Sequence, residues 1–185
     1  MGRGIIVFGA PGSGTSTVGR GLAKYLNFTH FETDDISGTK IDFPPFRISR
    51  TLEERTELLQ SALSTCCNFV ISGSMWDWGA PFIPFFDLAV FITAPTDIRI
   101  RRLERREYEK YGERILSNGD MFDNHRKFIE WAKTYDTNNP DRSLNLHEQW
   151  IATLPCPILR IDGTVSIVEN VVYIAEQYSH YLLMR

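Results

Sequence analysis

The sequence predicts an α/β fold in one domain, with a parallel sheet of five strands flanked by helices. Five short apolar runs alternate with segments in which apolar residues recur at helical spacing. Runs without a polar face are typical of parallel strands that helices cover on both sides, and their alternation with helices indicates βαβ units. A chain of 185 residues without an internal repeat or a low-complexity linker is long enough for one sizeable core. We therefore expect a single domain over residues 1–185.

Expected strands and helices alternate along most of the chain, and one segment departs from this pattern. The expected strands cover residues 4–8, 29–32, 69–72, 88–93 and 157–161, and the expected helices cover 15–26, 52–63, 96–111, 123–135 and a last segment from residue 166. Residues from about 105 to 145 depart from the pattern, because charged side chains and turn residues such as Gly112 and Gly119 interrupt it. This composition predicts an insertion with mobile turns, a candidate lid over a site.

Composition and charge exclude several classes of protein. Hydrophobic residues make up 43% and charged residues 23% of the chain, which excludes a disordered tail protein, a collagen-like chain and a coiled coil. With 20 basic and 23 acidic side chains the net charge is −3, so we expect no nucleic-acid partner. The longest apolar stretch, residues 81–95, contains Pro84 and Asp87. It is shorter than the roughly 20 residues of a spanning helix, so we expect no membrane partner.

Cysteine usage points to a reducing compartment. The three cysteines cannot all pair with one another, and the adjacent Cys66 and Cys67 would make a poor disulfide. The apolar run at residues 5–8 is too short for the core of a signal peptide. We therefore expect a cytoplasmic protein, while the sequence does not indicate its oligomeric state.

The strongest motif lies between the first expected strand and the first expected helix. Residues 9–16 read Gly-Ala-Pro-Gly-Ser-Gly-Thr-Ser, close to the phosphate-binding pattern G-x-x-x-x-G-K-[ST]. Glycines let the chain turn tightly so that backbone N–H groups surround a phosphate, and the helix that follows adds the positive end of its dipole. The residues expected to bind nucleotide phosphates are Gly9, Ala10, Gly12, Ser13, Gly14, Thr15, Ser16 and Thr17. The alternative is a glycine-rich turn that binds nothing.

One position of this motif departs from the pattern. Thr15 stands where the pattern has lysine, whereas Ser16 is in register to offer its hydroxyl to Mg2+. A backbone cradle survives the loss of a lysine, but a fixed positive charge near the transferred phosphoryl group does not. By analogy with the removal of one stabilising donor, the catalytic deficit is roughly 3 kcal/mol, or about a hundredfold in rate. Arginines of the lid segment are the candidates to offset it.

With this motif, the chain resembles the small P-loop kinases, particularly shikimate kinase and adenylate kinase. The similarity covers about the first 110 residues and the last strand and helix, and it includes Val18-Gly19-Arg20 after the loop. The resemblance implies a three-layer P-loop NTPase fold with a five-stranded parallel sheet and a helical lid insertion. It also implies an acceptor-binding region at about residues 36–62 and transfer of the γ-phosphoryl group of ATP with Mg2+.

The end of the second expected strand carries acidic residues of the kinase pattern. Residues 31–35 read Phe-Glu-Thr-Asp-Asp, similar to shikimate kinase. The resemblance implies that Glu32 helps to hold Mg2+ and that Asp34, as a catalytic and substrate-binding residue, accepts a hydrogen bond from the substrate hydroxyl. The alternative is a helix-capping acidic turn with Asp34 or Asp35 as the N-cap.

Two further positions belong to the expected acceptor site. Arg47 follows Phe46 and resembles the Phe-Arg pair that grips an anionic acceptor, although solvated charge at a helix start is the alternative. Gly73, after the third expected strand, permits close approach of the backbone to a substrate. Ser72 stands where a second acidic metal partner is found in adenylate kinase. Tryptophans that follow, Trp76 and Trp78, are interpreted as packing residues rather than as stacking partners for a base.

Basic residues after the fourth expected strand complete the motif set. Arg102 and Arg106 are four residues apart on one helix face and resemble the adenylate kinase arginines that flank the nucleotide phosphates. We expect both to be catalytic, with an exposed helix covered by ion pairs as the alternative. Gly163 lies in an Asp-Gly-Thr sequence that adenylate kinases carry beside the adenine. Residues 117–150 match no pattern of these families.

The sequence therefore favours an ATP-dependent kinase for a small anionic metabolite or a nucleoside monophosphate. The alternative is a P-loop protein that binds nucleotide but transfers phosphate weakly or not at all, because Thr15 replaces lysine and Ser72 replaces an acid. The identity of the acceptor stays open at this stage.

Overall fold

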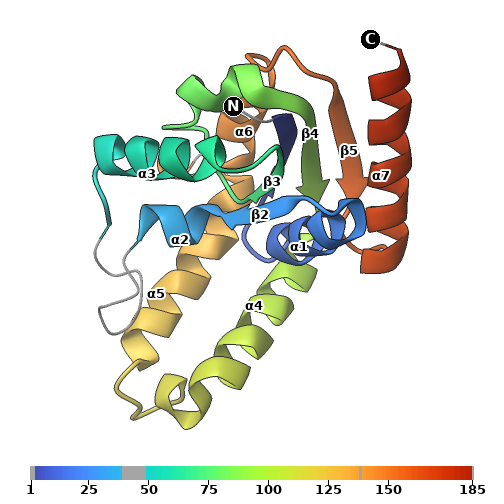
Figure 1. Ribbon diagram of the computed structural model, residues 1–185. Helices are drawn as coiled ribbons and strands as arrows, with labels where there is room; N and C mark the ends of the chain where they lie inside the picture. Colours follow the sequence, from blue (N-terminus) through green and yellow to red (C-terminus); the bar gives the residue numbers. More distant parts are fainter. Residues whose placement is uncertain (1–2, 39–48, 138, 185) are drawn as a thin grey trace.

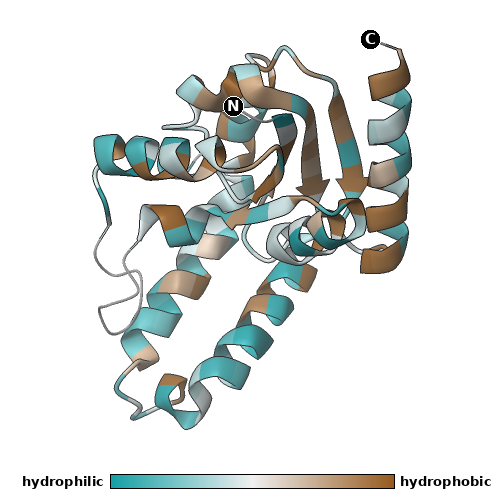
Figure 2. Ribbon diagram, in the orientation of Figure 1, coloured by the Kyte–Doolittle hydropathy of each residue, from teal (hydrophilic) through white to brown (hydrophobic). Residues whose placement is uncertain are grey.

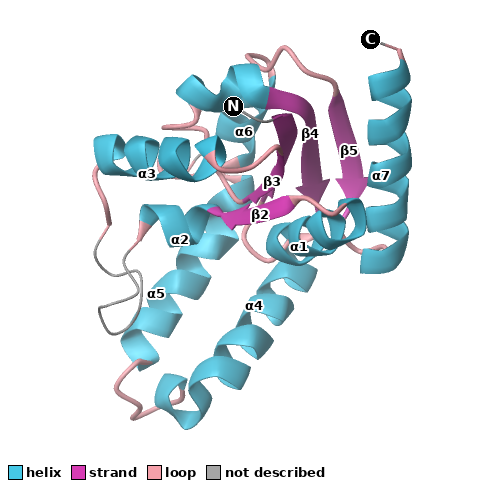
Figure 3. Ribbon diagram, in the orientation of Figure 1, coloured by secondary structure: helices cyan, strands magenta, loops and turns pink. Residues whose placement is uncertain are grey.

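A parallel five-stranded sheet forms the centre of the molecule (Figures 1 and 3). The computed structural model describes residues 3–38, 49–137 and 139–184. The strand order is β2-β3-β1-β4-β5, and every neighbouring pair is parallel. The strands are β1 (Arg3–Gly9), β2 (Thr29–Glu32), β3 (Asn68–Ser72), β4 (Phe86–Thr93) and β5 (Ile158–Asp162). The predicted fold class is confirmed, and each predicted strand is found within two residues of its expected ends.

Helices connect the strands and cover the sheet. The α-helices of the described residues are α1 (Thr15–Leu26), α2 (Thr33–Ser37), α3 (Leu52–Ser64), α4 (Thr96–Tyr111), α5 (Phe122–Lys133), α6 (Leu144–Ile151) and α7 (Ile167–Leu183). Three 3-10 helices are η1 (Ala80–Phe85), η2 (Gly112–Ile115) and η3 (Thr134–Asp136). The predicted helix over 123–135 ends earlier, because its last residues form η3. Helices α2 and α6 were not predicted, since one is a single turn and the other spans only eight residues.

Alternate residues of β1 pack into two separate hydrophobic cores, one on each face of the sheet. Ile6 and Phe8 point to the face covered by α3 and α6, whereas Ile5 and Val7 point to the face covered by α1 and α7. All four side chains are fully buried. Because both faces of the sheet are covered, the central strands β1, β3 and β4 are mostly apolar, whereas the edge strands β2 and β5 also carry polar residues, as Figure 2 shows.

Strand order fixes where a ligand site can form. β1 lies between β3 and β4, and the chain leaves the sheet toward opposite edges from this point. In open α/β sheets a crevice forms outside the carboxyl ends of the strands at such a switch point. Here the crevice lies between the start of α1 and the ends of β2 and β3.

Helices α4 and α5 run side by side and project away from the sheet (Figure 1). Their far ends are hydrophilic on most faces (Figure 2). Near the sheet they are held by a small apolar cluster of Ile100, Leu103, Ile129 and Ala132. The pair occupies the segment for which a lid is predicted, and that role stays a prediction. Among the described residues, no helix combines the length and apolar character needed to cross a membrane.

Candidate active site

The loop between β1 and α1 presents unpaired backbone donors to the crevice. Gly12 and Gly14 have φ angles of 80° and 108°, which favour glycine. Gly14 is the N-cap of α1 and makes no side-chain cap, and the first N–H bonded within the helix is that of Val18, to the Gly14 carbonyl oxygen at 2.9 Å. The N–H groups of residues 15–17 therefore have no helical partner. Since the first turn also contains no acidic residue, this end of the helix suits an anion.

Ser13 adds a second feature that suits a polar ligand at this loop. Its side chain is fully buried, and its Oγ has no hydrogen-bond partner among the described residues. A buried hydroxyl without a partner is costly, so a ligand that reaches it would be stabilised. Gly163 packs directly against this loop, because a Cβ at Gly163 would overlap the Ser13 carbonyl oxygen. The structure thus brings the predicted Gly163 beside the predicted phosphate loop.

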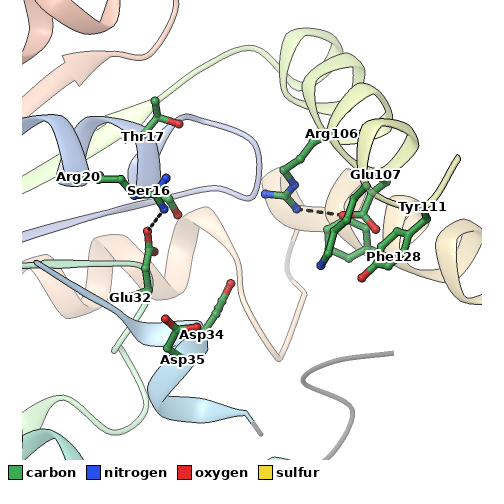
Figure 4. Close-up of a pocket in the computed structure, with 11 residues that line it drawn as sticks. Ser16, Thr17, Arg20, Glu32, Asp34, Asp35, Arg106, Glu107, Tyr111 and Phe128 are labelled. Atoms are coloured by element: carbon green, nitrogen blue, oxygen red, sulfur yellow. Dashed lines mark hydrogen bonds and ion pairs between the residues drawn. The ribbon is translucent and has the colours of Figure 1, made fainter. Parts of the chain in front are cut away.

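Ser16 and Glu32 meet at one side of the crevice (Figure 4). Burial raises the pKa of the Glu32 carboxyl, while hydrogen bonds from Ser16 and Arg20 oppose this shift. The Arg20 Nη2 to Glu32 Oε1 distance is 3.2 Å. Within the described ranges, no group of three or more His, Cys, Asp or Glu side chains is arranged to hold a metal ion. Any cation here would therefore need phosphate oxygens or water beside Ser16 and Glu32.

Ser72 is engaged in the sheet rather than in the crevice. Its side chain is fully buried, and its Oγ lies 2.5 Å from His30 Nε2. It also packs beneath Gly19 of α1, where a Cβ would overlap the hydroxyl. Ser72, at the position where an acidic metal ligand was expected, is therefore hydrogen-bonded to His30 within the sheet.

The acceptor side of the crevice is formed by the ends of β2 and β3. A cavity of about 200 Å³ is lined by the phosphate loop together with Asp34, Gly73 and Arg142. Gly73 has a φ of 111°, and a Cβ there would overlap the Thr33 hydroxyl, so the tight approach requires glycine. Asp34 is exposed and points into the open space in Figure 4. The alternative in which Asp34 or Asp35 caps the helix is wrong, because the N-cap of α2 is Glu32 and it makes no side-chain cap.

Arg142 is a site residue for which the sequence carried no motif. It precedes α6, lies with its guanidinium carbon 5.5 Å from the centre of the Trp131 ring, and lines the same cavity as Asp34. Burial lowers the pKa of Arg142, and the charges of Asp34 and Asp77 oppose this shift. The hydrogen bonds and ion pairs of the described residues do not include its guanidinium. A half-buried cation with no ion-pair partner among the described residues favours an anionic ligand.

The predicted lid arginines face the loop from α4. Arg102 and Arg106 line a cavity of about 290 Å³ with Gly12, Gly14 and Thr15. Arg106 also borders the acceptor-side cavity and the outer crevice of about 690 Å³ in Figure 4. The ion pair of Arg106 Nη2 with Glu107 Oε1 is long, at 3.5 Å. Arg47 lies outside the described residues.

A second arginine without a sequence motif, Arg99, connects the loop to the projecting helices. Arg99 is fully buried on α4, and its Nη1 donates to the carbonyl oxygens of Pro11 and Ala132, at 3.4 Å each. Its Nη2 lies 2.5 Å from Asp136 Oδ2. The side chain thus joins the phosphate loop to α5 and η3. No sequence motif marks it, because its partners lie up to 88 residues away.

The tryptophans fulfil the predicted packing role. Trp78 is 6% exposed and lies edge-on to Phe82 in the core. Trp76 packs at the edge of this core, and its Nε1 donates to the carbonyl oxygen of Asp141 at 3.0 Å. That bond ties the segment that carries Arg142 to the end of β3.

Comparisons with known proteins identify the family. The family model described as AAA domain matches residues 5–127, more than half of the chain. The protein YqaC of Bacillus subtilis, named an uncharacterized protein, is 38% identical over 172 residues, which cover 92% of this chain and 94% of YqaC. The chain belongs to the P-loop family of nucleotide and small-molecule kinases. The predicted family resemblance is therefore confirmed.

Two further known proteins are similar to this chain. Cytidylate kinase of Thermococcus sibiricus is 26% identical over 149 residues, which cover 76% of this chain and 75% of that kinase. The crystal structure of shikimate kinase from Bacteroides thetaiotaomicron matches with a TM-score of 0.57 and 17% identity, over 96% of this chain and 98% of that one. The latter is a likeness of fold.

Proposed function

We propose that this protein is an ATP-dependent kinase whose acceptor is a small anion, in the first place a nucleoside monophosphate. The observation that carries the proposal is Arg142, a half-buried cation that has no ion-pair partner among the described residues and borders the same cavity as Asp34 and the phosphate loop. An arginine in this position suits the phosphate or carboxylate of an acceptor. The similarity to cytidylate kinases supports a nucleoside monophosphate over a sugar acid.

The nucleotide would be bound by the loop after β1. Gly9, Ala10, Gly12, Ser13, Gly14, Thr15, Ser16 and Thr17 would bind its phosphates, with Gly163 at the base side. The Ser13 hydroxyl, which has no hydrogen-bond partner among the described residues, and the N-terminus of α1, which has no side-chain cap, fit this group. Ser16 and Glu32 would hold Mg2+, a set that suits an ion which keeps water and phosphate oxygens as ligands. The ion supplies charge neutralisation on the phosphate oxygens.

Charge near the transferred group would come from α4. Thr15 supplies no charge, whereas Arg106 borders each of the three cavities around the loop. We assign Arg106 to the lysine's electrostatic role, with Arg102 on the nucleotide side. Asp34 would accept a hydrogen bond from an acceptor hydroxyl and so orient the acceptor. Arg47 stays a further candidate for the acceptor anion.

Thr15 also favours a second candidate function, nucleotide binding without efficient transfer. The backbone donors of the loop do not depend on the lysine, so binding would persist where transfer had been lost. The two candidates make opposite predictions for a direct assay.

The test is phosphoryl transfer from ATP with Mg2+ to CMP, UMP, AMP, GMP and shikimate, with ADP release measured and products identified. We expect transfer to one acceptor, and Arg142→Met should lower kcat/KM for it by about tenfold or more while the KM for ATP is unchanged. Arg126→Met is the matched control, because Arg126 is an exposed α5 arginine paired with Asp123. Transfer to none of the acceptors by a protein that binds ADP would overturn the kinase proposal and favour the binding protein.

A further inference from the structure

A chain of buried hydrogen bonds ends at the wall of the acceptor-side cavity. The Tyr135 hydroxyl lies 2.7 Å from His147 Nδ1, and His147 Nε2 lies 2.8 Å from Ser74 Oγ. His147 is fully buried and Tyr135 is 3% exposed. Ser74 is also nearly buried, yet it lines the cavity beside Gly73 and Arg142. The three residues come from η3, α6 and the end of β3, so tertiary packing alone brings them together.

The imidazole of His147, in the middle of this series of hydrogen bonds, is neutral. Burial lowers the pKa of His147 to about 3, and the charge of Arg142 acts in the same direction. A neutral ring has one N–H donor and one acceptor nitrogen. The hydrogen bonds of Tyr135, His147 and Ser74 can therefore be arranged in only two ways. In one the hydroxyl hydrogen of Tyr135 is not used within the series, and in the other it is that of Ser74.

Counting hydrogens distinguishes the two arrangements. If Nδ1 carried the proton, it would donate to Tyr135, and the Tyr135 hydrogen would be left in the interior with no acceptor among the described residues. If Nε2 carries the proton, Tyr135 donates to Nδ1, Nε2–H donates to Ser74, and the Ser74 hydrogen is left over. Ser74 lines the acceptor-side cavity, where a ligand or water can accept that hydrogen, whereas Tyr135 does not line this cavity. An unpaired buried donor is costly, so the second arrangement is favoured.

We propose that Ser74 is an acceptor-binding residue, whose hydroxyl hydrogen is directed into the cavity by the Tyr135–His147 pair. His147 and Tyr135 are positioning residues, since they act through Ser74. The ligand group would be an oxygen anion, phosphate or carboxylate, that receives this hydrogen bond together with the Arg142 guanidinium. Its identification as the anion of a phosphoryl acceptor rests on the proposed function.

The first test is the tautomer of His147 in the unliganded protein, measured by long-range 1H–15N correlation on a histidine-labelled sample. Protonated Nε2 and unprotonated Nδ1 are expected. Protonated Nδ1 would overturn the proposal, because Ser74 would then donate to the ring instead of the cavity. This measurement does not depend on any activity.

The second test uses inorganic phosphate as the probe, followed through backbone amide shifts. Shifts at Gly73 and Ser74 report the acceptor-side cavity, and shifts at Gly12 and Gly14 report the phosphate loop. Ser74→Ala should weaken phosphate binding at the first pair by about tenfold, the value of a hydrogen bond to a charged group, and leave the second pair unchanged. Tyr135→Phe, which is nearly isosteric and keeps Ser74, should act in the same direction.

The matched control is Tyr178→Phe. Tyr178 is a buried tyrosine on the opposite face of the sheet, with its hydroxyl 3.4 Å from Asp87. Its loss should leave phosphate binding unchanged at both sites. Equal phosphate affinity of Ser74→Ala and the parent, or no phosphate shift at Gly73 and Ser74 in the parent, would overturn the assignment. A Ser74-dependent phosphate site in a protein that transfers nothing would instead overturn the proposed kinase activity.

Discussion

At the scale of single residues, His147 links burial to a measurable pH dependence. Its side chain packs edge-on against Phe8 and Phe91, and both ring nitrogens are hydrogen-bonded. The pKa of about 3 in the folded protein lies well below the ordinary value of 6.5. The unfolded chain therefore binds a proton at this residue before the folded chain does. The stabilising contribution is complete above the ordinary pKa and is lost as the pH falls toward 3.

From this shift we predict a loss of stability between pH 7 and pH 5 that depends on His147. Each pH unit below the unfolded pKa costs about 1.4 kcal/mol, so the free energy of unfolding should fall by about 2 kcal/mol more in the parent than in His147→Gln. Urea unfolding at the two pH values measures the difference. His180→Gln, which changes an exposed residue of α7, should keep the parental pH dependence. Equal slopes in the parent and His147→Gln would contradict the prediction.

Thr15 and Arg106 form a second prediction at this scale. If Arg106 has taken over the role of the lysine, Arg106→Met should lower kcat by roughly a hundredfold in the parent. The same change should cost much less in a Thr15→Lys background, because the introduced lysine supplies the charge. The four kcat values of this double-mutant cycle measure the coupling. Additive effects would show that the two positions act independently.

At the scale of elements, Arg99 determines how the phosphate loop meets α4 and α5. Its guanidinium reaches Pro11 in the loop, Ala132 at the end of α5 and Asp136 in η3. It also lies 5.3 Å from the centre of the Tyr135 ring. One buried side chain therefore couples the loop to both projecting helices. A neutral replacement would remove this donor from the carbonyl oxygens of Pro11, Ala94 and Ala132.

We predict that Arg99→Met lowers the free energy of unfolding by about 2–4 kcal/mol and weakens ADP binding. Chemical denaturation and calorimetric titration with ADP measure the two effects. Arg101→Met is the matched control, because Arg101 is on the same helix and is 70% exposed in an ion pair with Asp97. It should change stability by no more than about 0.5 kcal/mol. A similar loss of unfolding free energy in both variants would contradict the proposed connection of the loop, α4 and α5 through Arg99.

At the scale of the whole molecule, the outer crevice is open while its two walls carry complementary groups. Ser16, Glu32 and Asp34 lie on the sheet side, and Arg106, Tyr111 and Phe128 lie on α4 and α5 (Figure 4). The crevice of about 690 Å³ is large enough for ligands on both sides of the loop. Closure of α4 and α5 over bound ligands would exclude water from the reacting groups.

We predict that hydrogen exchange in α5 and η2 slows when a nonhydrolysable ATP analogue and CMP are both bound. Either ligand alone should have a smaller effect, because one ligand touches one wall. Exchange in α7, which lies on the far side of α1 from the crevice, serves as the internal reference. Unchanged exchange in α5 with both ligands bound would contradict a lid role for this pair of helices.

The sequence alone was enough to predict the architecture and the glycine-rich loop after β1, because both depend on local patterns of residues. Continuous apolar runs require strands buried on both faces, and a glycine-framed turn between strand and helix requires an exposed set of N–H groups. Glu32, Asp34 and Gly73 lie at or within two residues of a strand end, and the roles of Glu32 and Asp34 were predicted from the resemblance to the P-loop kinases. The tertiary structure decided the rest of the site. Arg99, Arg142 and the Tyr135–His147–Ser74 chain acquire their roles from partners distant in sequence, because burial and packing, not spacing along the chain, set which polar groups meet.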